Sequence, residues 1–66
     1  MYEYTYPKSS KPDLDKIYND VINSTMTNKN IAGCLWHESD KILRVYFFDP
    51  LSSDDKVILD GIVASA

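Results

Sequence analysis

The chain has 66 residues, of which 44% are hydrophobic and 26% are charged, and its formal net charge is −3 at pH 7. This length allows one domain, residues 1–66, and the composition is that of a folded chain rather than a disordered one. The acidic balance and the scattered basic residues exclude the Lys and Arg clusters that bind nucleic-acid phosphates, and no apolar stretch approaches the roughly 20 residues that span a bilayer. We therefore expect neither a nucleic-acid partner nor a membrane partner.

The chain is small enough that extra stabilisation is expected. Domains of this size bury only about 60% of the surface that their unfolded chains expose, and many rely on a disulfide, a metal or a partner. Cys34 is the only cysteine, which excludes a disulfide within one copy, and Cys34 with His37 falls short of the roughly four ligands of structural zinc. We therefore expect no cofactor and no metal, and we expect the chain to bind a further copy of itself.

The first predicted strand covers residues 2–6, where tyrosines alternate with polar residues and so share one face. Pro7 is expected to end this strand. A helix is predicted over residues 11–26, because Ser10 and Asp13 have the spacing of a capping box. Its apolar side chains recur at helical spacing. They are Leu14, Ile17, Tyr18, Val21 and Ile22.

A polar connection at residues 27–30 leads into two further predicted strands. Residues 31–36 form the first of them, residues 37–41 a hairpin loop, and residues 42–48 the second. Side chains alternate across that last strand, so one face is wholly apolar and is expected to pack against helices, whereas the other carries an arginine. The two faces consist of Leu43, Val45 and Phe47, and of Ile42, Arg44, Tyr46 and Phe48.

A second helix is predicted over residues 52–65, with Ser52 as its N-cap and acidic residues in its first turn. Gly61 lowers its helix propensity by about 1 kcal/mol relative to alanine and is either tolerated or a sign of close packing. The order β-α-β-β-α predicts an α+β fold, a small antiparallel three-stranded sheet with both helices on one face. The expected core comprises Leu14, Ile17, Val21, Leu43, Val45, Phe47, Leu59, Ile62 and Val63.

The sheet face opposite the helices has no cover in this arrangement. We expect it to carry aromatic side chains, with Trp36 or Leu35 contributed by residues 31–36, although alternation alone leaves open which face the tyrosines occupy. Exposed apolar patches on small proteins mark contacts with other chains. We therefore predict a homo-oligomeric contact through some of Tyr2, Tyr4, Tyr6, Trp36, Arg44, Tyr46 and Phe48.

The residues that could support catalysis or metal binding do not form a site. His37 beside Glu38 has the composition of a general base with a carboxylate partner, and Cys34 could serve as a nucleophile. However, Cys34 and His37 stand three residues apart on a predicted strand and so project to opposite faces. The acids between residues 49 and 55 lack the alternating ligands and the turning glycine of a calcium loop. We therefore predict a non-enzymatic protein.

Residues 49–63 read DPLSSDDKVILDGIV. This block resembles the C-terminal end of short proteins encoded by tailed bacteriophages and marine viruses, in which a hydrophobic strand precedes Leu-Ser-x-acid-acid and a Leu-Asp-x-Ile-Val helix. The resemblance implies a phage-type structural or accessory protein and assigns no site residues. Because residues 1–11 lack a basic-then-apolar signal pattern, we expect a cytoplasmic location, or a virion if the chain is phage-encoded. The leading functional hypothesis is an interaction or assembly protein that self-associates. The alternative is an acidic accessory factor that binds or inhibits a host protein.

Overall fold

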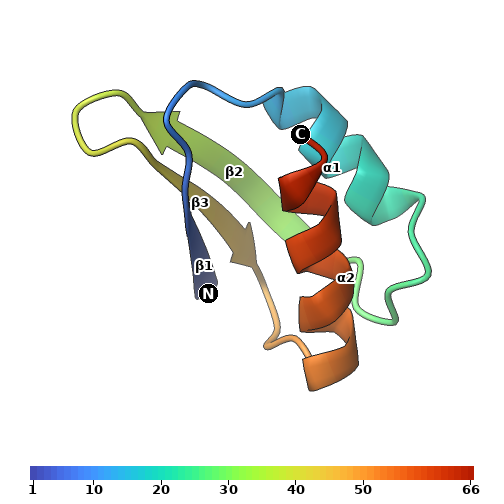
Figure 1. The fold of residues 1–66 in the computed structure, drawn as a ribbon. Coiled ribbons are helices and arrows are strands. Elements are labelled where there is room, and N and C mark those ends of the chain that lie inside the picture. The colour runs from blue at the N-terminus through green and yellow to red at the C-terminus, as the bar shows by residue number, and fades with distance from the viewer.

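The computed structural model describes residues 1–66 and contains two helices and three strands (Figure 1). The predicted order β-α-β-β-α is confirmed. The elements are β1 (Tyr2–Pro7), α1 (Leu14–Ile22), β2 (Ile31–His37), β3 (Ile42–Phe47) and α2 (Ser53–Ala64).

The strands form one antiparallel sheet with the order β1-β3-β2, so the last strand in the chain lies in the middle. Both edge strands pair antiparallel with β3 and therefore run parallel to each other. The connection from β1 to β2 through α1 is thus a crossover, and such crossovers are right-handed in nearly all sheets. Both helices lie on one side of the sheet, as Figure 1 shows. The predicted fold class, α+β with a three-stranded antiparallel sheet and two helices on one face, is confirmed.

The central strand separates a buried face from an open face. Leu43, Val45 and Phe47 are 0% exposed and contact the helices, as their alternation predicted. Seven of the nine expected core residues are buried, whereas Leu14 and Ile62 lie half-buried at its margin. Met26 and Ile31 complete the core instead. Both belong to the connection after α1 or the strand that follows it, so they are brought inward by the chain path and not by helical spacing.

The first helix is shorter than the predicted range of residues 11–26. Its N-cap is Asp13, whose Oδ1 accepts a hydrogen bond from the Lys16 amide at 3.0 Å, so the expected capping box does not form. At the other end, Asn23 Nδ2 donates to the carbonyl of Asn19, and Ser24 Oγ donates to that of Val21. These polar side chains satisfy the last carbonyls and end the helix. In α2, the predicted cap is confirmed, because Ser52 Oγ accepts from the Asp55 amide at 3.2 Å.

Pro7 is the last residue of β1 and stands opposite Ile42, so the strand ends at this proline, one residue beyond the predicted range. The Lys8 amide donates to the Lys41 carbonyl at 2.9 Å, and hydrogen-bonded positions alternate along an antiparallel pair. The nitrogen of Pro7 therefore points away from β3, where its missing hydrogen breaks no bond. An edge strand tolerates proline at this position, and the sequence could not show that this strand is an edge.

Candidate interaction surface

The expectation that the β1 tyrosines lie on the open face is wrong, and of the two alternatives Trp36 and Leu35 it is Leu35 that lies there. Tyr2, Tyr4 and Tyr6 stand opposite Phe47, Val45 and Leu43, respectively, and directly paired residues project to the same face. Trp36 stands opposite Leu43 as well. These aromatic side chains therefore surround the core on the helix side.

The two inner tyrosines connect the edge strand β1 to the C-terminal part of the chain. The Tyr4 ring lies 5.9 Å from that of Phe47 in an edge-to-face arrangement, and its hydroxyl accepts from the Leu51 amide at 2.8 Å. The Tyr6 hydroxyl donates to Asp60 Oδ1 of α2 at 2.7 Å, and the Lys56 ammonium lies 5.0 Å from its ring centre. Burial, together with the hydrogen bond to Asp60, raises the pKa of Tyr6. The rings supply apolar area while the hydroxyls reach polar partners at the rim.

Trp36 closes the opposite end of the same face. Its Nε1 donates to the Lys8 carbonyl at 3.1 Å, and the Lys41 ammonium lies 5.6 Å from its ring centre. The segment that leaves β1 is thereby held against β2. Trp36 is consequently a contact within the chain and not a free aromatic surface.

The open face carries a cluster of charged and polar side chains centred on Arg44. The guanidinium of Arg44 lies 2.6 Å from Asp40 Oδ2 and 3.9 Å from Glu3 Oε2, and the Tyr46 hydroxyl donates to Glu3 at 2.9 Å. The hydrogen bond from Arg44 holds the pKa of Asp40 below its usual range, and the hydrogen bond to Glu3 raises that of Tyr46. Of the residues predicted for this face, Arg44 and Tyr46 do lie on it, and Phe48 follows them at 53% exposure. Because the two carboxylates already neutralise the arginine, this face does not offer a free cation.

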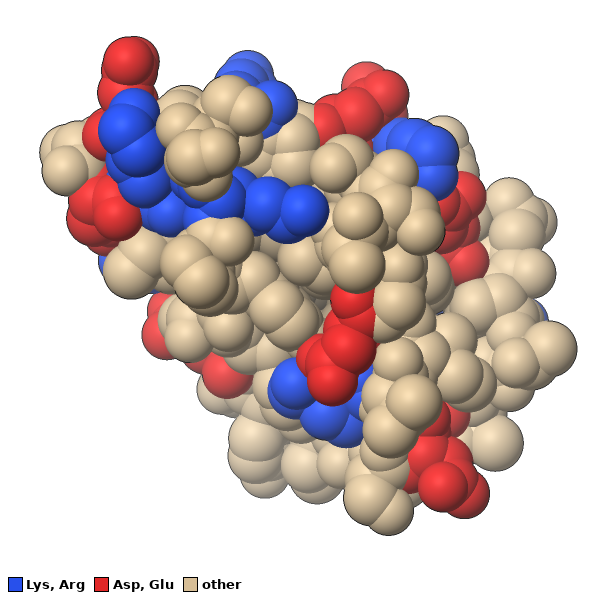
Figure 2. Space-filling view, viewed as in Figure 1, with Lys and Arg blue, Asp and Glu red and all other residues tan.

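Charges elsewhere are also interspersed. Figure 2 shows most Lys and Arg side chains next to Asp or Glu on the face that it presents. Two such pairs join positions four apart on a helix, Lys16 with Asp20 at 2.6 Å and Lys56 with Asp60 at 2.5 Å. Exposed pairs of this kind contribute little to stability.

Cys34 and His37 project to opposite faces, as expected from their spacing. Cys34 stands opposite Val45 on the helix side, and His37 stands opposite Ile42 on the open side. The Cys34 thiol lies 3.6 Å from the Leu14 carbonyl, and burial raises its pKa, with a further contribution from Asp15. A raised pKa lowers the thiolate fraction, so Cys34 has the surroundings of an inert thiol. No group of three or more His, Cys, Asp or Glu side chains is placed to hold a metal ion.

Asp55 has a role that the sequence did not reveal. Its side chain was expected to serve only the first turn of α2, yet the residue is 3% exposed. Its carboxylate accepts from the Thr27 amide at 2.9 Å, the Thr27 hydroxyl at 2.8 Å and the Asn28 amide at 3.0 Å. The amides of Asn28 and Thr27 hold the pKa of Asp55 below its usual range. Only the polar composition of residues 27–30 hinted at such a partner.

Further hydrogen bonds join the same two loops. Asn28 Nδ2 donates to the Asp49 carbonyl at 3.1 Å, and Asn30 Nδ2 donates to Asp49 Oδ2 at 3.2 Å. We call the contacts of Asp55 and Asp49 with residues 27–30 the loop clamp. The clamp fixes the start of β2 to the start of α2, and its partners lie within the chain.

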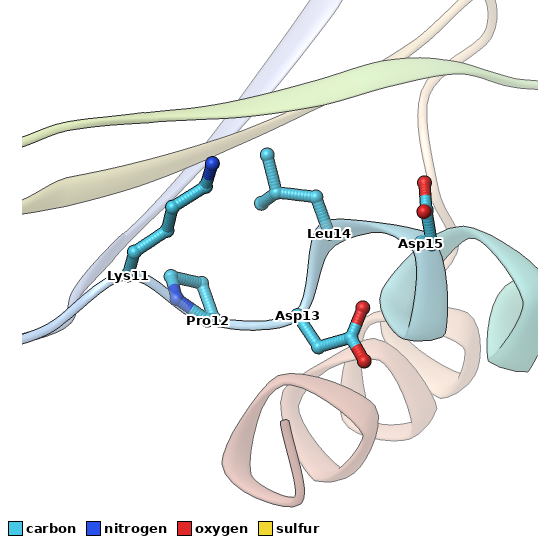
Figure 3. A pocket seen from close by; sticks show the side chains of 5 residues that line it. All are labelled: Lys11, Pro12, Asp13, Leu14 and Asp15. Atoms are coloured by element: carbon cyan, nitrogen blue, oxygen red, sulfur yellow. The ribbon is translucent and has the colours of Figure 1, made fainter.

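A hollow of about 280 Å³ lies at the N-terminus of α1, lined by five consecutive residues (Figure 3). Lys11 and Leu14 project to one side of this segment, and Asp13 projects to the other. Asp13 is already engaged as the N-cap, and no buried side-chain nitrogen or oxygen atom in the chain lacks a hydrogen-bond partner. The hollow therefore lies at the helix cap, where Asp13 is already hydrogen-bonded within the chain.

Three exposed apolar side chains belong to β2 and to α1, the helix that packs on it. Leu35, at 41% exposure, lies on the open face of this strand opposite Arg44. Tyr18 and Ile22 of α1 are 43% and 41% exposed. Each follows a fully buried residue of α1 by one position, which turns it by about 100° around the helix axis.

The handedness of the β1–α1–β2 crossover determines the direction in which Tyr18 and Ile22 project. α1 packs on β2 and also contacts α2, which is hydrogen-bonded to the opposite edge strand β1 through Tyr6 and Asp60. For a right-handed crossover, a side chain turned by about 100° after the buried positions faces away from α2 and toward the outer edge of β2. Tyr18, Ile22 and Leu35 thus flank this edge from the helix side and the open side. We call these three residues and the edge between them the β2 flank.

Neither helix is long and apolar enough to cross a membrane. In comparisons with known proteins, no family model, no curated protein and no solved structure matches the chain.

Proposed function

We propose that the chain is a small non-enzymatic interaction domain that assembles with a second copy of itself through the β2 flank. Three exposed apolar side chains, Tyr18, Ile22 and Leu35, carry this proposal, because strand order and a right-handed crossover direct them toward one unpaired strand edge. Large apolar side chains contribute strongly to interface energies, and a cluster beside an open edge offers both apolar area and backbone hydrogen bonds.

Tyr4 and Tyr6 of β1 no longer support association, because both pack against the core and bind partners within the chain, whereas Tyr2 lies on the same helix side at 47% exposure. The open face still bears Tyr46 and Phe48, but its arginine and carboxylates already bind one another. Docking this face would require removing those charged groups from water, which is costly. The cost is smaller at the β2 flank, because β2 contains no Asp, Glu, Lys or Arg and the charge that acts on this strand from α1 is Asp15, which influences Cys34.

We also propose that this association occurs in a phage-type structural or accessory protein, a setting supported by the resemblance of residues 49–63 to short phage and marine-virus proteins. The rival function is an acidic accessory factor that binds a host protein. It predicts a chain that stays monomeric at every concentration.

The test is sedimentation equilibrium of the wild type from low micromolar to several hundred micromolar concentration, compared with Ile22→Lys. We expect a reversible dimer, and we expect Ile22→Lys to weaken it at least about tenfold by burying an unpaired charge. Val57→Lys is the matched control, because Val57 is an exposed apolar residue on α2, at 69% exposure, outside the β2 flank.

Two results would count against the proposal. A wild type that stays monomeric at the highest concentration rules out self-association and favours the accessory factor. A dimer that Ile22→Lys leaves intact but Tyr46→Lys disrupts would move the contact to the open face.

A further inference from the structure

The outer edge of β2 presents backbone groups without partners. The Phe48 amide donates to the Asn30 carbonyl at 3.1 Å, and the Lys8 amide donates to Lys41 on the other side of β3. Because bonding alternates along antiparallel strands, even-numbered β3 residues bond to β2. Leu35 and His37, which face Arg44 and Ile42, therefore direct their backbone groups to β3.

Cys34 and Trp36, which alternate with these two residues, direct their backbone groups away from β3. The amides and carbonyls of Cys34 and Trp36 accordingly point away from the sheet, and none of the backbone bonds formed outside the strands and helices involves either residue. An edge of this kind is a template for another strand.

The two edges of the sheet differ in how well they can accept a strand. On β1, the outward positions are Glu3, Thr5 and Pro7, of which Pro7 has no amide hydrogen and Glu3 is charged. On β2, a bulge between Ile31 and Gly33 disturbs the start of the strand, but residues 34–37 beyond it are regular and uncharged. The accessible template is therefore short and lies around Leu35.

We infer that two copies pair antiparallel through β2 about a twofold axis at Leu35, which joins their three-stranded sheets into one sheet of six strands. This inference rests on the proposed self-association and specifies its geometry. Cys34 of each copy stands opposite Trp36 of the other, and their outward amides and carbonyls form four hydrogen bonds. The two Leu35 side chains meet at the axis on the open face.

Three features favour a second copy of the chain as the partner at the outer edge of β2. The paired strands bring no like charges opposite each other, because β2 has none. The twofold axis also places the two α1 helices side by side, since α1 packs on β2, so Tyr18 and Ile22 face their counterparts. The two helices run in opposite directions, which lets their dipoles attract.

The size of the contact sets the expected affinity. The molecule measures 32 × 22 × 18 Å, and its β2 side offers a footprint on the order of 400 Å² per copy. Interfaces of this size belong to weak or transient complexes. The dimer should therefore dissociate in the micromolar range.

The test is a disulfide at the axis, in a Cys34→Ala background that removes the native thiol. Residues opposite each other at a position without backbone bonds have Cα atoms about 4.5 Å apart, within the range that a disulfide spans. We expect Leu35→Cys, equilibrated with oxidised and reduced glutathione, to form a covalent dimer at concentrations where the noncovalent dimer is populated. Val57→Cys in the same background is the control and should remain monomeric on a denaturing gel.

The possible outcomes test the twofold pairing at Leu35 separately from self-association. Covalent dimer for Leu35→Cys but not Val57→Cys supports the twofold axis. If the Cys34→Ala parent dimerises in the centrifuge while folded Leu35→Cys, checked by circular dichroism, does not cross-link, this pairing is wrong and self-association stands. If the parent and the wild type are both monomeric, both proposals fail.

Discussion

Asp55 is a carboxylate with the burial of a core residue, and burial of a charge is unfavourable unless hydrogen bonds replace the lost water. Here two amides and one hydroxyl from Thr27 and Asn28 do so. All three donors come from a loop that precedes α2 by more than 20 residues, with separations of 27 and 28. One side chain thus both begins a helix and fixes a distant loop.

Replacing Asp55 by asparagine should lower the melting temperature by on the order of 10 °C, because the amide nitrogen meets donors where the carboxylate accepted them. Asp54→Asn is the matched control. It removes the same charge from the same helical turn without touching residues 27–30, and it should change the melting temperature by no more than about 2 °C. Equal losses in the two variants would show that helix-terminal charge, and not the loop clamp, is responsible.

The contribution of Asp55 should also depend on pH. Its folded pKa lies below the ordinary value of 3.8, so the folded state binds its proton less readily than the unfolded state. The stabilisation is therefore fully present above that value and is lost as the pH falls through the folded pKa. Thermal melts of wild type and Asp55→Asn should differ by a constant amount from pH 7 to about pH 5 and converge below about pH 3.8. A difference that grows on acidification would contradict this assignment.

At the scale of elements, replacing each of the two glycines by alanine should have opposite effects on the free energy of unfolding. Gly61 lies within α2 with nothing within 4 Å of the position a Cβ would take, so it is tolerated and does not mark close packing. Gly33 also has open space, but its φ of +153° at the β2 bulge is one that other residues rarely adopt. Gly61→Ala should therefore raise the free energy of unfolding by roughly 0.5–1 kcal/mol, and Gly33→Ala should lower it by about 1 kcal/mol or more. Chemical denaturation of both variants measures this, and a destabilised Gly61→Ala would reveal a packing constraint on α2.

The elements themselves could be predicted because their signals are local. Alternation along residues 42–48 and the Ser52 cap depend on neighbours in sequence, and both are confirmed in the fold. The face of the sheet that the β1 tyrosines occupy depends instead on residues distant in sequence. Alternation shows that its tyrosines share a face, but only pairing with β3 determines that the face is the inner one. The loop clamp and the β2 flank could not be predicted for the same reason. Their residues are distant in sequence, and only the strand order and the handedness of the crossover bring them together.

At the scale of the molecule, each copy carries a net charge of −3, so two copies repel each other on association. Salt screens this repulsion, with a Debye length near 20 Å at about 20 mM and near 6 Å at about 300 mM. The dimer should therefore bind about two- to fourfold more tightly at the higher NaCl concentration, as measured by sedimentation equilibrium. Weaker binding at high salt would indicate an interface held by ion pairs, as a contact through Arg44 and Glu3 would be.

The proline in β1 has a consequence for how far assembly can proceed. A subunit that joins others through a strand edge behaves like a monomer in a polymerisation, and the number of reactive edges sets the product. With two reactive edges, each addition would expose a fresh one, and the sheet would extend into a fibre. Pro7 removes one of the three outward amides of β1, and Glu3 places a charge at another, so β1 is the poorer template of the two edges. In the proposed dimer, pairing through β2 uses the better edge of each copy, so we expect assembly through the sheet to stop at the dimer.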